Sequence, residues 1–234
     1  MIVDPDLVAA LARSVLPDGI AVAACDPRVM PSKIEAAEDA AIRTAVPRRR
    51  TEFHAGRAAA RAALSMLDIA PQPILTGPDR APVWPAGVTG SISHSRTACA
   101  AAVGLCRDWR GIGIDLEEAT PLDPALLPEI CTRSERAWLS TLGPDDQAHM
   151  AKLLFSAKEA AYKAQYQVTR TLFGFDTFEI RVDRDASRFR AVFQTSHGPF
   201  AAGDILRGRF RQAAGLLVTG VAVRQSGTAR TNNS

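Results

Sequence analysis

Hydrophobic and polar residues alternate along the chain with two periods, one helical and one of two residues. The helical period predicts helices at about residues 5–16, 32–45, 49–67 and 145–165, with a short one after Thr132. The first follows Asp4-Pro5, a capping residue before a proline. Ser32 with Glu35, and Thr132 with Glu135, have the spacing of capping boxes.

The two-residue period and short apolar runs predict strands. These lie at about 20–25, 88–93, 98–105, 112–117, 178–182, 189–194, 205–211 and 216–224. Prolines and glycines predict loops at 71–78 and 121–128. Helices and strands are mixed in each half without a regular βα alternation, which favours an α+β fold over a doubly wound sheet.

A polar turn at Cys106–Arg110 separates two halves of this pattern. We therefore expect an N-terminal lobe at residues 1–107, a C-terminal lobe at 108–226 and a disordered polar tail at 227–234. A monomer is expected, because each half can contribute one side of a cleft.

The composition narrows the class of protein. With 234 residues, 47% hydrophobic and 23% charged, the chain is typical of a globular protein, and it has no apolar run long enough to span a membrane. Its first residues are acidic rather than basic, and its four cysteines show no C-x-x-C spacing, so we expect a cytoplasmic protein with reduced thiols.

The net charge of +3 is too small to indicate nucleic-acid binding. Two basic clusters stand out, one of Arg48–Arg50 with Arg57 and Arg61, the other of Arg207, Arg209 and Arg211. Such clusters suit an anionic ligand or an acidic partner protein, although they are equally typical of a solvated face.

Two acids in the predicted strand 112–117 are candidate metal ligands. Asp115 and Glu117 lie two residues apart, so they point to the same face with Cα atoms roughly 6.5 Å apart. Two adjacent carboxylates repel unless a cation lies between them, and oxygen ligands without histidine or thiolate favour Mg²⁺ or Mn²⁺. Gly111 and Gly113 leave the backbone open to a ligand. The alternative is a strand with a merely solvated outer face.

The helix 145–165 separates its residues into two faces. Small residues such as Ala157, Ala161 and Ala164 share one face, which is suited to packing on a sheet. The opposite face carries Phe155, Lys158, Glu159, Tyr162, Lys163 and Tyr166. Glu159 and Lys163 stand in the i,i+4 relation, so the alternative to a site is a surface ion pair.

Together these two segments resemble a known family. G-I-D-L-E at 113–117 followed by F-S-A-K-E-A-A-Y-K at 155–163 resembles the paired signature of the phosphopantetheinyl transferases. The resemblance is to the larger, two-lobed kind that activates siderophore, peptide-synthetase and polyketide carrier proteins. R-R-T-E-F-H-A-G-R at 49–57, R-A-P-V-W-P at 80–85 and G-S-I-S-H-S at 90–95 are similar to the enterobactin-synthase-type subgroup.

The resemblance implies an architecture and a reaction. The fold would be two similar α/β lobes in a pseudo-twofold arrangement, with the active site at their junction. The enzyme would transfer 4′-phosphopantetheine from coenzyme A to a serine of an apo acyl, aryl or peptidyl carrier protein, and release 3′,5′-ADP.

The resemblance also implies roles for particular residues. Asp115, Glu117 and Glu159 would bind Mg²⁺. The chemistry of the transfer then makes Glu159 the candidate general base, directly or through a metal-bound water, with Lys163 stabilising the charge that develops on the transferred phosphate. Contacts to coenzyme A would come from Arg49, Arg57, Arg80, Ser93, His94, Asp115, Lys158 and Lys163. The chain departs from the family at Ala81, where many members have a charged residue.

The same residues are compatible with other functions. A metal-dependent phosphodiesterase would also use clustered acids and bases, although it normally has more acids or histidines for a second metal. A non-catalytic binding module would need the arginines but not Glu159. His94 is alternatively a cap of the turn at 93–97. Leu122–Leu127 are candidate docking contacts for the carrier or ordinary core residues.

Overall fold

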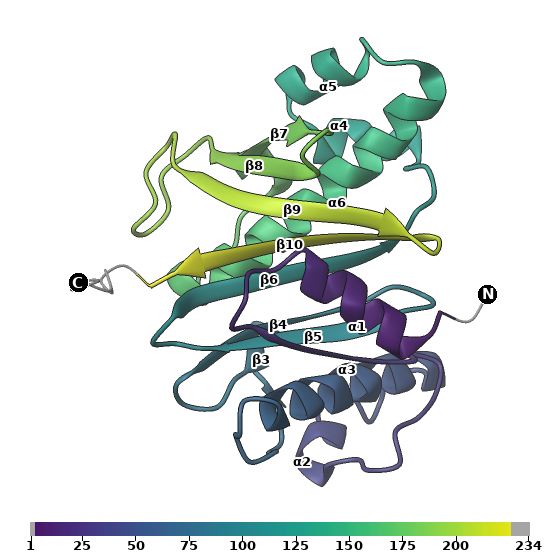
Figure 1. Cartoon of the computed structure of the whole chain (residues 1–234), viewed down its shortest axis with the longest axis vertical. Helices are drawn as coiled ribbons and strands as arrows, with labels where there is room; N and C mark the ends of the chain where they lie inside the picture. Colours follow the sequence, from purple (N-terminus) through teal and green to yellow (C-terminus); the bar gives the residue numbers. More distant parts are fainter. Residues whose placement is uncertain (1–2, 226–234) are drawn as a thin grey trace, which may run out of the picture.

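The computed structural model describes residues 3–225, which form two antiparallel sheets (Figure 1). The first sheet has the order β1-β5-β4, the second β6-β10-β9-β8-β7, and β2 and β3 form a separate hairpin. The strands are β1 Ala21–Cys25, β2 Leu75–Thr76, β3 Pro82–Val83, β4 Val88–His94, β5 Cys99–Leu105, β6 Trp109–Glu118, β7 Phe178–Asp183, β8 Arg188–Phe193, β9 Ile205–Ala213 and β10 Leu216–Arg224. The helices are α1 Pro5–Ser14, α2 Ala36–Asp39, α3 Pro47–Ser65, η1 Pro124–Leu126, α4 Leu127–Ile130, α5 Arg133–Leu139, α6 Pro144–Thr169 and η2 Phe175–Thr177.

The two sheets are built from similar units. In the first, β1 leads through the long helix α3 to β4 and β5, and β1 pairs with β5. In the second, β6 leads through the long helix α6 to β9 and β10, and β6 pairs with β10. β7 and β8 are additional strands of the second unit. The expected α+β fold with two similar lobes is confirmed.

The lobes meet where β4 runs beside β6. The backbone N–H of Ile114 donates to the hydroxyl of Ser91 at 3.1 Å, and that of Leu116 donates to the hydroxyl of Ser93 at 3.2 Å. Serine side chains thus take the place of a backbone ladder at this edge. The chain passes from one sheet to the other between Leu105 and Trp109. The division at residue 107 stays a prediction, and the tail at 227–234 lies outside the described residues.

Helix α1 packs over the junction and joins both lobes into one core (Figure 1). Its residues Val8, Leu11 and Val15 belong to a buried cluster with Ile112, Ile114 and Leu116 of β6. The same cluster includes apolar residues of β1, β5 and β10. Because alternate strand residues point to opposite faces, burying Ile114 and Leu116 under α1 turns Asp115 and Glu117 toward α6.

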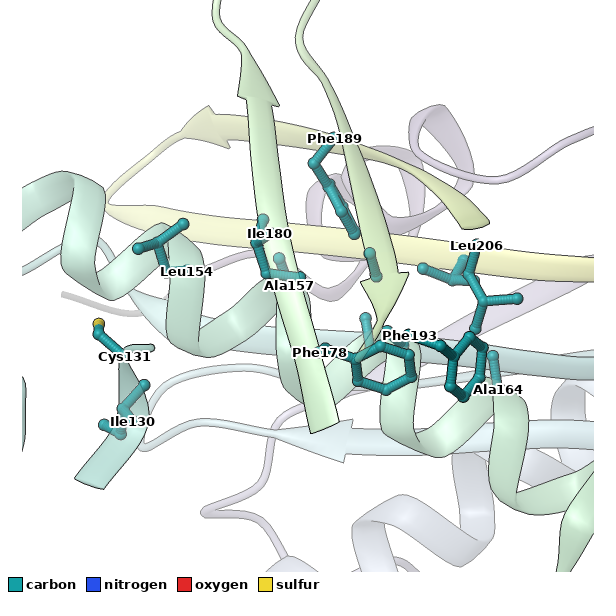
Figure 2. Packing of buried hydrophobic residues seen from close by; sticks show 14 of the residues in the cluster. Ile130, Cys131, Leu154, Ala157, Ala164, Phe178, Ile180, Phe189, Phe193 and Leu206 are labelled. Carbon is teal, nitrogen blue, oxygen red and sulfur yellow. The ribbon is translucent and has the colours of Figure 1, made fainter. Parts of the chain in front are cut away.

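The core of the second lobe lies between α6 and its sheet. Figure 2 shows Ala157 and Ala164 of α6 near Phe178 and Ile180 of β7 and the side chains of β8 and β9. The expected small-residue face of this helix is confirmed as its packing face.

Two glycines of β6 allow α6 to approach closely. A Cβ at Gly113 would lie 1.9 Å from the carbonyl oxygen of Ala160, and one at Gly111 would lie 2.0 Å from that of Ala164. The expectation that these glycines make room for a ligand is therefore wrong, since the helix backbone occupies the space.

Some predicted elements differ from the structure. The helix expected at 32–45 is limited to α2, and the Ser32–Glu35 capping box does not form. The reason is tertiary: Glu38 of α2 is fully buried, forms an ion pair with Arg61 and accepts the N–H of Ile74 at 2.8 Å. The predicted loop at 71–78 contains β2, and the loop at 121–128 contains η1 and the start of α4.

Other local expectations hold. The Thr132–Glu135 capping box is present at α5, and all eight predicted strands form with boundaries shifted by a few residues. Within the described residues, no helix is both long enough and apolar enough to cross a bilayer.

Candidate active site at the lobe junction

Three elements bring polar side chains together at the junction. Lys163 of α6 donates to Asp115 Oδ1 of β6 at 2.7 Å, to Ser93 Oγ of β4 at 3.2 Å and to the carbonyl oxygen of Ile114 at 3.2 Å. The hydroxyl of Ser93 in turn donates to Asp115 Oδ1 at 3.0 Å. The first lobe supplies Ser93 and the second supplies Asp115 and Lys163, so this cluster exists only when the lobes are joined.

Two further carboxylates face the same cluster. Glu117 forms an ion pair with Lys152 at 3.1 Å, and Glu159 approaches Lys163 at 3.9 Å. Burial, with repulsion from Asp115, raises the pKa of Glu117, and burial likewise raises the pKa of Glu159. Burial alone would lower the pKa of Lys163, but the charges of Asp115 and Glu159 outweigh it and raise that pKa. The cluster holds more negative charge than its lysines neutralise.

This donor set suits a hard divalent cation. Asp115 Oδ2 is buried and accepts no hydrogen bond from the described residues. As the side chains stand, no three His, Cys, Asp or Glu residues within 3–225 are arranged to hold a metal. Mg²⁺ does not require such a cluster, because it usually binds one or two carboxylates together with water and substrate phosphates. The residues present therefore fit Mg²⁺.

The arginines of α3 fall into two groups. Arg48 pairs with Glu52 and Arg50 with Asp39, each at 2.8 Å, and Arg61 pairs with the buried Glu38. Arg49 instead donates to Nε2 of His94 at 2.8 Å, and its nearest carboxylate, in Glu52, is 3.8 Å away. Arg49 is thus held beside the end of β4 with little of its charge neutralised.

Arg57 is a buried cation with little compensation. It makes a hydrogen bond to the Thr76 hydroxyl at 3.1 Å and lies 4.4 Å from the ring centre of Phe53, while its Nε has no partner among the described residues. Burial lowers the pKa of Arg57 to about 10. A buried guanidinium that forms no ion pair favours a nearby anion.

His94 is held in its neutral form. Burial and the charge of Arg49 lower the pKa of His94, so its Nε2 accepts a hydrogen bond from Arg49. The alternative of His94 as a cap is not needed, because the Ser95 hydroxyl accepts the N–H groups of Thr97 and Ala98.

Two cavities flank the cluster. One of about 210 Å³ lies between the β2–β3 hairpin, β4 and α6, and is lined by Asp79, Arg80, Lys163 and Tyr166 together with apolar residues such as Ile92 and Leu172. The other, of about 220 Å³, is mainly aromatic and is lined by Lys158, Glu159, Tyr162, Phe173, Gly174, Phe175 and Phe178. Lys163 lines the first and Glu159 the second, and Tyr162 lines both, so the two cavities lie about one turn of α6 apart.

Comparison with known proteins decides the family. The family model described as 4′-phosphopantetheinyl transferase N-terminal domain matches residues 37–104, and that of the 4′-phosphopantetheinyl transferase superfamily matches residues 111–207. The chain is 42% identical to 4′-phosphopantetheinyl transferase Svp of Streptomyces mobaraensis over 80% of this chain and 77% of that protein. The chain belongs to the 4′-phosphopantetheinyl transferase superfamily.

Two further relatives bear on the subgroup. The superfamily member is 36% identical to 4′-phosphopantetheinyl transferase Npt of Nocardia iowensis, over 90% of this chain and 98% of that protein. It is also 38% identical to enterobactin synthase component D of Salmonella typhimurium, over 59% of this chain and 57% of that protein. The likeness to the enterobactin-synthase-type subgroup is confirmed at that level.

Lys158 of this superfamily member is buried beside α5 and η2, away from the expected phosphate site. Its side chain is 1% exposed, and its ammonium donates to the carbonyl oxygens of Ile130 and Phe175 and to Glu135 at 2.7–2.9 Å. All three donor positions are used inside the protein. The expected contact of Lys158 with the coenzyme A phosphates is therefore wrong in this structure.

Three further residues at the junction were not among the predicted site residues. Ser91 lies two residues before Ser93 on β4 and binds β6 in the same way, which the period of a strand would have indicated. Lys152 lies two helical turns before Glu159, on the same side of α6, and neutralises Glu117. The Tyr166 hydroxyl donates to Asp79 across the junction, a contact that no sequence signal predicts.

Proposed function

We propose that this protein transfers the 4′-phosphopantetheine group of coenzyme A to a serine of an apo carrier protein and releases 3′,5′-ADP. The observation that carries the proposal is the cluster of Asp115, Glu159 and Lys163 with Ser93 at the lobe junction. The similarity of the chain to enterobactin synthase component D supports a carrier protein of siderophore or peptide synthesis as the acceptor.

Coenzyme A has a nucleotide end rich in phosphate and an uncharged pantetheine arm; Arg80 and Lys163 line one cavity, and aromatic side chains make up much of the other. We assign the 3′-phosphate and diphosphate to Arg49, Arg57, Arg80 and His94, with Ser93 and Lys163 nearer the reacting phosphorus. Arg80 is exposed in the hairpin turn and lines the same cavity as Lys163. The aromatic cavity beside Glu159 suits the pantetheine arm.

Asp115, Glu117 and Glu159 would hold Mg²⁺, or Mn²⁺, together with the diphosphate. The ion would neutralise charge on the diphosphate and on the leaving 3′,5′-ADP. Asp115 Oδ2 accepts no hydrogen bond from the described residues, and burial together with repulsion from Asp115 raises the pKa values of Glu117 and Glu159. A cation among the three carboxylates would favour their ionised forms, which supports this assignment.

The protein's own residues account for the proton and charge movements. The carrier serine hydroxyl attacks the phosphorus that bears pantetheine, and the bond from that phosphorus to the bridging oxygen breaks with its electron pair leaving on 3′,5′-ADP. Glu159 accepts the serine proton, directly or through a water molecule. Lys163 lies beside the developing charge on the transferred phosphate.

The segment 122–127 offers few exposed apolar residues for docking of the carrier. Of the apolar residues expected at 122–127, Leu122 is buried in the core of the second lobe, so its docking role is wrong. Leu126 is 41% exposed and stays a candidate docking contact.

The four free cysteines support the proposed cytoplasmic location. One chain provides both sides of the junction, which supports a monomer.

Replacement of Glu159 by glutamine tests the reaction. Glu159→Gln is expected to reduce transfer by roughly two to four orders of magnitude, the usual contribution of a general base, while coenzyme A still binds. The measurement is mass spectrometry of an apo carrier protein incubated with coenzyme A, Mg²⁺ and the enzyme, beside calorimetric coenzyme A binding.

A matched control is Glu35→Gln. Glu35 pairs with Lys33 at 3.0 Å, and its side chain is 23% exposed against 29% for Glu159, so the two substitutions remove similar groups. Normal transfer by Glu159→Gln would show that another residue is the base. Release of 3′,5′-ADP without a mass gain on several types of carrier would instead favour a phosphodiesterase.

A further inference from the structure

The outer face of the second sheet is rich in arginine. Helix α6 packs on one face of this sheet, and α1 covers the other face over β6 and β10, so no helix of the described residues lies in front of β7 and β8 (Figure 1). Exposed arginines beside β8 are Arg181 of β7, Arg188 and Arg190 of β8, and Arg207 and Arg209 of β9, and Arg211 lies farther along β9 on the same face. We refer to the five arginines beside β8 as the arginine face.

The strand register places these cations directly beside one another. Arg181 lies opposite Arg190, Arg190 lies opposite Arg207, and Arg188 lies opposite Arg209. Directly opposed residues have Cβ atoms about 4.5–5.5 Å apart, and like charges at that spacing destabilise a sheet. The row of Arg181, Arg190 and Arg207 across three strands therefore lowers the stability of the sheet, and folding does not require arginine at these exposed positions.

Nearby acids compensate little of this charge. Arg181 forms an ion pair with Glu179 at 3.1 Å, and none of the other four forms one with the described residues. Asp183 lies opposite Arg188, but its carboxylate accepts the N–H of Ala186 at 3.0 Å instead. The arginine face is thus a positive surface on a protein whose net charge is only +3.

A shallow cavity and apolar residues adjoin the arginines. The cavity, of about 260 Å³, is lined by Arg181, Arg188, Arg190 and Arg207 together with Val182, Asp183, Phe189 and Gly208. In the next row of the same face, Val192 lies opposite Ile205, which is 41% exposed. Arginine beside exposed apolar side chains is typical of protein–protein interfaces.

We propose that the arginine face is the docking surface for an acidic protein surface. Guanidinium groups bind carboxylates in a bidentate manner, and the face contains arginine without lysine. The exposed side chain of Ile205 in the next row can also pack against apolar side chains of a protein, which a nucleic-acid backbone and lipid headgroups do not offer. A protein partner is therefore favoured over both.

The arginine face lies on the side of the sheet opposite the candidate active site. Asp115, Glu159 and Lys163 lie on the α6 side of the sheet, and the arginine face lies on the opposite side. A partner bound there leaves the lobe junction open. The surface therefore recruits the protein to an acidic partner, and this inference does not depend on the chemistry proposed for the junction.

Reversal of the central charge tests the proposal. In Arg190→Glu the new carboxylate lies between Arg181 and Arg207, so the variant is expected to unfold at higher urea concentration than the wild type. It is also expected to bind a fluorescent glutamate-rich peptide at least tenfold more weakly at low salt. Transfer to an isolated carrier protein should be unchanged, which separates this test from that of the proposed function.

The matched control is Arg43→Glu, which makes the same charge change at an exposed site of the first lobe. Equal loss of peptide affinity in both variants would attribute binding to net charge and overturn the proposal. Lower stability of Arg190→Glu would show that the arginines support the fold and would also overturn it. Tighter, Arg190-dependent binding of a DNA duplex or of anionic phosphatidylglycerol vesicles would overturn the choice of a protein partner.

Discussion

Neighbouring residues on one helix can have unrelated roles, as Lys158, Glu159 and Lys163 show. The sequence groups all three on one arc of α6, yet Lys158 is buried while Glu159 and Lys163 are partly exposed. The difference arises because α5 and η2 pack beside Lys158 and enclose it. Helical spacing specifies the direction of a side chain around the helix axis. It does not specify which segment of the chain packs against that side chain.

The structure predicts that Lys158 supports folding rather than substrate binding. Lys158→Met leaves Glu135 as an unpaired buried carboxylate, which is expected to cost about 3–5 kcal/mol of unfolding free energy. Urea denaturation measures the loss. Lys163→Met is the comparison: its loss of transfer activity should be large and its loss of stability smaller, since its side chain is 25% exposed. A Lys158→Met variant that is as stable as the wild type but binds coenzyme A poorly would show that Lys158 does contact the phosphates.

A second prediction at this scale concerns His94 and pH. Because the folded-state pKa of His94 is lowered, the unfolded chain takes up its proton at higher pH than the folded protein does. The unfolding free energy should therefore fall as the pH drops below the ordinary histidine pKa of about 6.5, and His94→Gln should reduce this dependence. Urea titrations at a series of pH values check the slope. His149→Gln serves as control, and an unchanged slope in His94→Gln would contradict the assignment.

At the scale of elements, the contact between β6 and α6 positions the candidate site. Gly111 and Gly113 bring the strand against the helix backbone, and the next residue on that face, Asp115, then meets Lys163. A strand with side chains at these two positions would hold the helix farther away and separate these groups.

Gly113→Ala tests this dependence. Its methyl group would lie 1.9 Å from Ala160 O, so overpacking is expected to cost about 1–3 kcal/mol or more and to reduce transfer in proportion to the shift of α6. Thermal unfolding and the carrier assay measure the two effects. Gly143→Ala is the control, because a Cβ there meets nothing within 4 Å. Full activity in Gly113→Ala would show that the site does not need this approach.

At the scale of the whole molecule, the site belongs to neither lobe alone. Ser93 and His94 end β4 in the first lobe, while Asp115 and Lys163 come from β6 and α6 in the second. Serine-mediated hydrogen bonds and the packing of α1 over the junction hold β4 beside β6. The arrangement explains why one chain with two similar units can build an asymmetric site.

The sequence by itself determined the strands, the long helices, the face of β6 that carries Asp115 and Glu117, and the motifs that indicate the family. These follow from local periodicity and from residue types at fixed spacing, which need no knowledge of distant contacts. The α1 start and the α5 capping box are local in the same sense.

Only the tertiary structure decided which charged residues are available for a ligand. It paired Arg48, Arg50 and Arg61 with acids, left Arg49 and Arg57 without close ion pairs, and buried Lys158. It also shortened the predicted helix at 32–45 by burying Glu38, and it aligned the arginines of β7, β8 and β9 in rows. Each outcome depends on a partner many residues away, and the free energy of burying a charge depends on that partner rather than on local sequence.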